Sequence, residues 1–87
     1  MIFKECNLKG AYLIDLERHE DSRGYFSRTF CKMEFMDNGI DFNCAQCDIS
    51  VNTFENTLRG MHYQKEPYME AKIVQCIKGS IYDVIID

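Results

Sequence analysis

The sequence is poor in several residue types: it has no tryptophan, one proline and two histidines among 87 residues. It also lacks an excess of basic side chains. Its net charge of −4 argues against a non-specific nucleic-acid binder, because neutralising phosphates requires clustered Lys and Arg. No apolar run approaches the roughly 20 residues that span a bilayer. Charges interrupt the N-terminal stretch M-I-F-K-E where a signal peptide has its apolar segment. These absences predict a cytoplasmic protein without nucleic-acid or membrane partners.

The length and composition are those of one small globular domain. Hydrophobic residues make up 46% and charged residues 28%, which indicates a folded rather than a disordered chain. A domain of this size has little core to spare.

The five cysteines, at positions 6, 31, 44, 47 and 76, are odd in number and do not have the spacing of a secreted disulfide scaffold. Reduced thiols are therefore expected. Cys44 and Cys47 have the spacing of a metal or redox pair. If residues 44–50 form a strand, however, the two thiols point to opposite faces and cannot share a metal. We favour small buried thiols, with a metal or redox pair as the alternative.

The pattern of apolar and turn-forming residues predicts an all-β fold with one short helix. Short strands joined by brief turns favour an antiparallel sandwich or barrel over a βαβ fold. A helix is expected over 31–38, with Asn38-Gly39 as its stop signal. A charged loop closed by glycine is expected over 17–24, a polar loop over 52–56, a turn around Pro67 and a tight connection over 78–80. Strands are expected over 11–16, 25–30, 44–51, 57–64, 71–77 and 81–86.

The sequence stops at Asp87, inside or just after an apolar strand. Such a strand needs neighbours on its hydrogen-bonding edges and a cover for its faces. We expect that a natural chain continues beyond this residue; the alternative is that another chain completes the sheet.

Residues 58–64, L-R-G-M-H-Y-Q, are the most specific segment. They resemble the L-R-G-x-H-Y-Q signature of the dTDP-4-dehydrorhamnose 3,5-epimerases, a family of cupin-type jelly-roll enzymes. Further blocks that resemble the family occur in its order over nearly the whole chain: D-S-R-G-Y-F at 21–26, Q-C-D-I-S at 46–50, A-K-I-V at 71–74, K-G at 78–79 and D-V at 83–84. The resemblance implies an incomplete cupin-type jelly roll, in which residues 1–87 are the N-terminal half of a single epimerase domain.

The resemblance also implies a chemistry. Epimerising a carbon next to a ketone requires removing its α-proton, holding the enolate and returning a proton to the opposite face. Imidazole suits the base, so His62 takes that role. Lys72 stabilises the enolate oxygen, because a fixed cation near developing negative charge lowers the barrier. The substrate-binding residues implied are Arg23, Arg28, Gln46, Asp48 and Arg59.

The expected substrate is dTDP-4-dehydro-6-deoxyglucose, in dTDP-rhamnose biosynthesis, with no metal or organic cofactor. The expected assembly is a homodimer in which Arg23 reaches the nucleotide diphosphate, often across the interface. Asp48 stands where the family usually has Asn, which should weaken binding near phosphates. The family's acid Tyr and the Asp that orients the base belong to its C-terminal half. We therefore expect the 87-residue chain alone to have little epimerase activity and poor solubility.

The expected strands decide which of the site residues share a face. Gln46, Asp48 and Ser50 would alternate onto one polar face of a strand, whereas Arg59 and His62 diverge unless glycine bends the chain between them. An inactive remnant that binds nucleotide-sugar or only dimerises is one alternative. A metal-binding cupin is the other, although such proteins present H-x-H and here the second position is Gln64.

Overall fold

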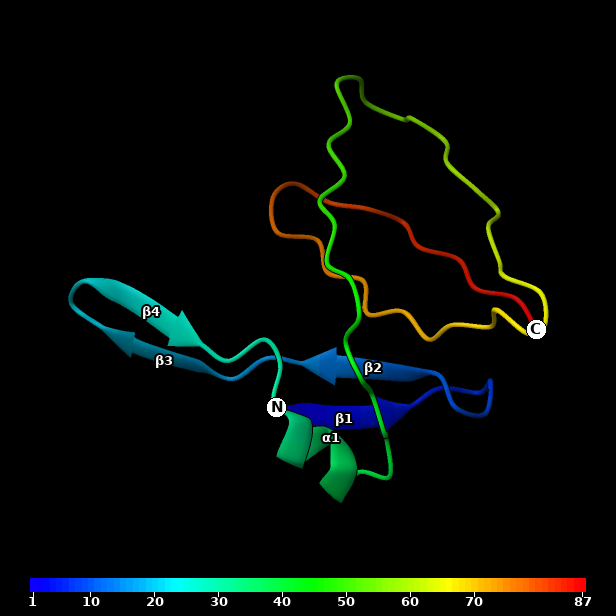
Figure 1. Cartoon of the computed structure of the whole chain (residues 1–87). Helices are drawn as coiled ribbons and strands as arrows, with labels where there is room; N and C mark the ends of the chain where they lie inside the picture. The colour runs from blue at the N-terminus through cyan, green and yellow to red at the C-terminus, as the bar shows by residue number, and fades with distance from the viewer. The chain divides into compact units, whose positions relative to one another are not determined.

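The computed structural model describes all 87 residues and divides them into two units. The hairpin unit comprises residues 1–43 with 85–87, and the loop unit comprises residues 44–84. All regular elements belong to the hairpin unit (Figure 1). They are β1 (Ile2–Glu5), β2 (Tyr12–Asp15), β3 (Arg18–Asp21), β4 (Gly24–Ser27) and α1 (Lys32–Asp37).

The four strands form two separate antiparallel hairpins, β1 with β2 and β3 with β4. In the first, Phe3 lies opposite Ile14. In the second, Asp21 lies opposite Gly24, so the turn consists of Ser22 and Arg23 alone. The Asp21 carboxylate accepts a hydrogen bond from the Arg23 backbone N–H at 2.8 Å, the local contact by which Asp commonly starts a turn.

Helix α1 ends as the Asn-Gly pair predicts. Gly39 has φ +73°, a left-handed conformation that only glycine adopts without a Cβ penalty. Its N–H donates to the Met36 carbonyl at 2.9 Å, and the Ile40 N–H donates to the Phe35 carbonyl at 2.9 Å. These two bonds form a Schellman motif, which satisfies carbonyls at the helix end.

The core is a cluster of four phenylalanine rings around Phe35, whose exposure of 2% makes it the single buried hydrophobic residue of the chain. The Phe35 ring meets Phe3 edge-on at 5.1 Å and Phe30 at 4.8 Å between centroids. Phe42 completes the cluster, 6.0 Å from Phe30. Edge-to-face packing at these distances is the preferred arrangement of aromatic rings. The cluster joins β1 to α1 and to the segments on either side of the helix.

The fold class is confirmed: the regular structure is antiparallel β with one short helix. The cupin jelly roll stays a prediction. The strand expected over 11–16 is β2, the helix expected over 31–38 is α1, and the strand expected over 25–30 is the shorter β4. No helix is both long and apolar enough to span a membrane.

Two expectations in the hairpin unit are wrong. The charged loop expected over 17–24 contains β3, and β1 was not expected at all. Every residue of β3 is exposed, so a charged side chain costs nothing there. Hydrogen bonds to β4, rather than apolar alternation, define this strand.

In the loop unit the turns are confirmed and the strands are not. Turns or bends lie at 53–56, at 66–68 and at 78–79, as expected. The segments 44–51, 57–64, 71–77 and 81–86 contain no strand, and Figure 1 draws the loop unit without an arrow. The Tyr68 N–H to Lys65 carbonyl bond, at 2.8 Å, is the one backbone hydrogen bond found within this unit. Residues with high β-propensity become a strand only when a second strand completes the ladder, and none does so here.

Candidate functional site

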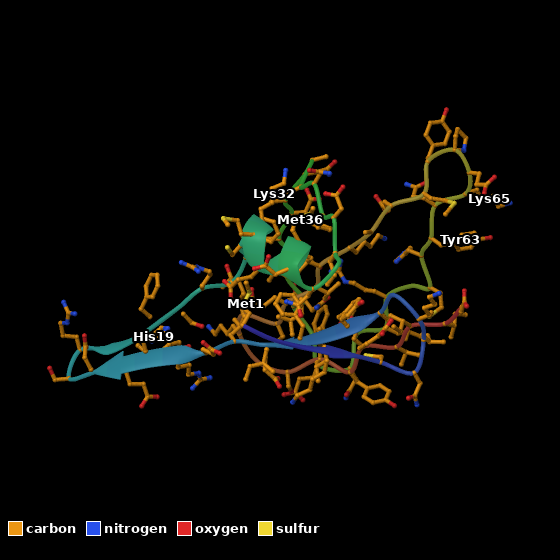
Figure 2. The ribbon with its side chains drawn as sticks, turned by 90° about the horizontal axis from the view of Figure 1, so that it is seen from below. Met1, His19, Lys32, Met36, Tyr63 and Lys65 are labelled. Atoms are coloured by element: carbon orange, nitrogen blue, oxygen red, sulfur yellow. The ribbon has the colours of Figure 1, made fainter.

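The segment that contains His62 is bent at Gly60. Gly60 has φ +104°, a conformation that side chains with a Cβ rarely adopt. A Cβ at this position would lie 3.6 Å from His62 Nδ1, so the glycine and the imidazole are in close proximity. His62 itself is exposed, and its neighbour Tyr63 projects away from the chain trace (Figure 2). Gly60 therefore supplies the bend without which Arg59 and His62 were predicted to diverge, although no strand surrounds it.

Arg59 bridges the two ends of the loop that precedes this segment. It donates from Nε to Asn52 Oδ1 at 2.6 Å and from Nη2 to the Val51 carbonyl at 3.1 Å. Within the loop, Thr57 Oγ1 donates to the Phe54 carbonyl at 2.8 Å. The guanidinium of Arg59 is thus held by Val51 and Asn52, and Arg59 itself lies three residues before His62.

Lys72 forms an ion pair with Glu70, at 3.2 Å between Nζ and Oε1. Both side chains are about half exposed, so solvent screens the pair and its contribution to stability is small. No hydrogen bond or ion pair joins Lys72 to His62. The structure does not bring the two predicted catalytic residues into contact.

Gln46 and Asp48 are brought together. The Gln46 side-chain amide donates from Nε2 to Asp48 Oδ2 at 2.9 Å. The two side chains therefore lie on the same side of the chain, as their spacing predicts, without forming part of a strand. The carboxylate at position 48 gains a neutral partner in this way.

Arg23 lies at the tip of the β3–β4 hairpin and contacts Asp21. Its Nη2 is 2.6 Å from Asp21 Oδ2, and its Nε lies 3.3 Å from both carboxylate oxygens. These bonds lower the pKa of the Asp21 carboxyl and raise the pKa of the Arg23 guanidinium. The Arg23 side chain is 88% exposed, so its other face is open to a ligand. It also lines a shallow cavity of about 220 Å³ along the hairpin.

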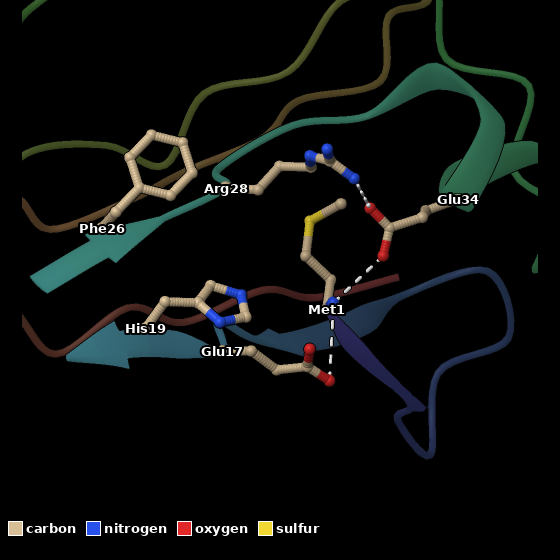
Figure 3. Close-up of a pocket in the computed structure, with 6 residues that line it drawn as sticks. All are labelled: Met1, Glu17, His19, Phe26, Arg28 and Glu34. Atoms are coloured by element: carbon tan, nitrogen blue, oxygen red, sulfur yellow. Dashed lines mark hydrogen bonds and ion pairs between the residues drawn. The ribbon is translucent and has the colours of Figure 1, made fainter.

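Arg28 lies in a different polar cluster, which surrounds the Glu34 carboxylate (Figure 3). Arg28 Nη1 donates to Glu34 Oε2 at 3.0 Å, and the Met1 α-ammonium donates to Glu34 Oε1 at 3.1 Å. The ammonium also lies 3.8 Å from Glu17 Oε1. The hydrogen bond from Arg28, followed by that from the N-terminus, lowers the pKa of Glu34. The cluster borders a cavity of about 130 Å³, lined by Met1, Glu17, His19, Phe26, Arg28 and Glu34.

Sequence reasoning missed the partners in this cluster. His19 lies opposite Phe26 in the β3–β4 register, and both line the cavity. The sequence offers little signal for this cluster, because all residues of 17–23 are polar or charged and their alternation distinguishes no face.

The cysteine expectation is also wrong. Because residues 44–50 do not form a strand, Cys44 and Cys47 do not point to opposite faces; their sulfurs lie 3.3 Å apart. Both thiols are exposed rather than buried. No group of three or more His, Cys, Asp or Glu side chains that could hold a metal ion occurs in the chain.

Comparison with known proteins identifies the family. The family model described as dTDP-4-dehydrorhamnose 3,5-epimerase matches residues 5–87. The chain belongs to the dTDP-4-dehydrorhamnose 3,5-epimerase family. All seven predicted site residues, His62 and Lys72 among them, have positions within the matched range. No solved structure matches the chain significantly.

The relatives of this epimerase-family chain come from distant organisms. A dTDP-4-dehydrorhamnose 3,5-epimerase of Methanothermobacter thermautotrophicus is 38% identical over 98% of the chain, and one of Sinorhizobium fredii is 34% identical over 100%. A dTDP-4-dehydrorhamnose 3-epimerase of Streptomyces niveus is 30% identical over 100% of the chain. The chain spans 45% of the length of the first two relatives and 42% of the third.

Proposed function

We propose that the protein is a nucleotide-sugar epimerase that acts on dTDP-4-dehydro-6-deoxyglucose in dTDP-rhamnose biosynthesis. The observation that carries the proposal is the family match over residues 5–87, which includes the L-R-G-M-H-Y-Q segment. In this proposal residues 1–87 are the N-terminal half of a single cupin-like domain. The share of the relatives' length that the chain spans, 45%, supports that division.

His62 is the proposed base. The carbons on either side of the C4 ketone carry acidic protons, and an imidazole can accept one of them. Exposure of the His62 side chain supports this role, because a sugar can reach it. A positioned general base contributes about 10²–10⁴ to the rate.

Lys72 is the proposed partner for the enolate oxygen. Removal of the α-proton places negative charge on the ketone oxygen, and an ammonium group there lowers the barrier. In the structure the ammonium is balanced by Glu70 at 3.2 Å. The pair is solvent-exposed and weak, so Lys72 can exchange this partner for the substrate oxygen at little cost.

The diphosphate is assigned to Arg23, and the further substrate-binding residues of the proposal are Arg28, Gln46, Asp48 and Arg59, with Asp48 beside the nucleotide and Arg59 beside the base. Arginine donates two parallel hydrogen bonds to phosphate, which fixes orientation as well as charge. The open face of Arg23 supports its assignment. Asp48 introduces a negative charge near the phosphates, and its hydrogen bond from Gln46 offsets only part of that repulsion.

The test is wash-in of solvent deuterium at C3 and C5 of the substrate, measured on the protein at the length its gene encodes. We expect His62→Ala to slow the exchange by at least about 100-fold, the lower range for loss of a general base. Lys72→Met should slow it by about 10²–10³, the range for loss of one oxyanion donor. Affinity for dTDP should change little in both variants, since neither residue is assigned to the diphosphate.

The matched control is Lys65→Met, which removes an exposed lysine outside the assigned site (Figure 2). Its exchange rate should equal that of the unmodified protein. Exchange that survives in His62→Ala would remove His62 from its role. Exchange at C3 alone would assign the protein to the 3-epimerase activity named for the Streptomyces niveus relative. Binding of dTDP without any exchange would contradict the epimerase proposal.

We also propose that the protein forms a homodimer. Large apolar side chains are exposed in many places, and four of them exceed 77% exposure: Ile49, Phe54, Leu58 and Tyr82. Where such side chains gather into one patch, the patch is typical of a protein-interaction site, and the proposal assigns them to one. A second copy of the chain is the partner that the proposal names.

A further inference from the structure

Cys44 and Cys47 form a thiol pair that the epimerase chemistry does not use. Their sulfurs are 3.3 Å apart, and Cys44 Sγ also lies 3.7 Å from the Gln46 carbonyl oxygen. The two side chains therefore converge, although the backbone between them forms neither a turn nor a bend. Both residues are exposed, so a small molecule can reach either sulfur.

The pair is the only one of its kind in the chain. All five cysteines are free thiols, and Cys44 and Cys47 form the one sulfur–sulfur contact among them. Cys76 Sγ instead contacts the Lys78 carbonyl oxygen at 3.4 Å. The sulfur–sulfur contact is therefore a local feature of residues 44–47, and the other cysteines do not share it.

The two thiols differ in their surroundings. The hydrogen bond with Cys44 raises the pKa of Cys47, and the charge of Cys44 and a small desolvation act in the same direction, as does the charge of Asp48. The thiolate is the attacking species in exchange reactions, so the raised pKa makes Cys47 the slower nucleophile, and we assign the first attack to Cys44.

We propose that Cys44 and Cys47 are a redox-active dithiol, which a low-molecular-weight disulfide converts reversibly to an intramolecular disulfide. The proposal rests on the sulfur positions and is independent of the epimerase assignment. A metal site is less well supported, since no third ligand accompanies the pair.

The reaction balances as two successive exchanges. The Cys44 thiolate attacks one sulfur of the disulfide R–S–S–R, which forms Cys44–S–S–R and releases R–S⁻. Cys47 then loses its proton and attacks the Cys44 sulfur, which forms the Cys44–Cys47 disulfide and releases the second R–S⁻. The protein loses two electrons and the small disulfide gains them. The two sulfurs have to move from 3.3 Å to the bonded distance of about 2.05 Å.

The test compares two variants in buffers that contain reduced and oxidised glutathione. The first replaces Cys6, Cys31 and Cys76 by Ser, so that only the proposed pair remains. The second is its complement, in which Cys44 and Cys47 are replaced by Ser. Intact-mass measurement should show the first variant lighter by the two thiol hydrogens, whereas the complement should carry only glutathione adducts. Glutathione adducts without ring closure in the first variant would overturn the proposal.

A denatured control distinguishes the effect of the native backbone on ring closure from the effect of the short sequence separation between the two cysteines. Two cysteines three positions apart also react in an unfolded chain, because the ring between them is short. The equilibrium constant for ring closure should be at least about tenfold larger for the native first variant than for the same variant in guanidinium chloride. Equal constants would show that the backbone at 44–47 contributes nothing, and would overturn the proposal.

Single substitutions test the order of attack. Cys47→Ser should accumulate a glutathione adduct on Cys44, because the second exchange cannot occur. Cys44→Ser should accumulate an adduct on Cys47 more slowly. The opposite order of rates would overturn the assignment of Cys44 as the first nucleophile.

Discussion

At the scale of single residues, the Glu34 side chain joins two cationic groups. Its carboxylate accepts hydrogen bonds from Arg28 and from the Met1 ammonium, and these bonds lower its pKa. A carboxyl whose pKa is lower in the folded state than in the unfolded state stabilises the fold at pH values above its unfolded-state pKa. This stability is lost as the pH falls through the folded pKa. The hairpin unit should therefore lose stability on acidification below the ordinary range of Glu.

We expect Arg28→Gln to raise the pKa of Glu34 toward its ordinary value, because the largest cause of its lowering is removed. A carbon-detected NMR titration of the Glu34 carboxyl measures this directly. The control is Lys4→Gln, which breaks a separate ion pair with Asp15 and should leave Glu34 unchanged. An unchanged titration in Arg28→Gln would show that the Arg28 contact does not persist in solution.

Residue identities could be predicted from the sequence, but their contacts could not. Arg28 is among the predicted substrate-binding residues, yet its partner Glu34 lies six positions away on a helix, and the second partner of Glu34 is the Met1 ammonium. Cys44 and Cys47 show the opposite failure. Their spacing suggested a pair, and an assumed strand geometry dismissed it. A wrong assignment of the element thus produced a wrong conclusion about its side chains.

At the scale of elements, the end of α1 depends on one glycine. Gly39 has φ +73° and carries the first bond of the Schellman motif. Gly39→Ala should destabilise the hairpin unit by about 1–2 kcal/mol, the cost of a Cβ in a left-handed conformation. Urea unfolding followed by circular dichroism measures the change.

The matched variant is Gly39→Asn, because asparagine tolerates this conformation better than alanine. It should be less destabilising than Gly39→Ala. Equal effects in both variants would show that the left-handed backbone is not the cause. No atom within 4 Å would meet the new Cβ, so steric overlap does not complicate the comparison.

Turns were predictable and strands of the loop unit were not, for a physical reason. A turn is decided by residues next to one another, as at Pro67, where the Tyr68 N–H reaches the Lys65 carbonyl. A strand is decided by hydrogen bonds to a segment elsewhere in the sequence. The same reason explains why β3 was not predicted. Its residues are charged, and it is a strand because it forms hydrogen bonds with β4.

At the scale of the whole molecule, the exposed large apolar side chains are unevenly distributed between the two units. Most of the exposed large apolar side chains belong to the loop unit. We therefore expect self-association, with a dimer as the first species in sedimentation velocity over a range of concentrations.

Substitution of an exposed apolar residue should weaken this association. Ile77 is 75% exposed, and Ile77→Lys should raise the dissociation constant at least about tenfold, because burying one such side chain is worth about 1.5–3 kcal/mol. Thr53→Lys adds the same charge at a polar position and serves as the control. A monomer at all concentrations would contradict the homodimer.

The family and the fold class could be predicted from the sequence, because the motif blocks and the β-rich composition extend over nearly the whole chain. The separation into a hairpin unit and a loop unit could not. It depends on where burial is achieved, and a ring cluster around Phe35 achieves it in one unit alone.

Arg59 holds Val51 and Asn52 with the same guanidinium that we assign to the substrate. On that assignment, a substrate that draws this group away competes with two internal acceptors, so substrate affinity and closure of the 51–59 loop are thermodynamically linked. By reciprocity, a change that opens the loop makes the guanidinium available to the substrate, and a change that stabilises the closed loop makes it less available. The loop would then act as an internal competitor of the substrate, covalently attached to the residue that binds it.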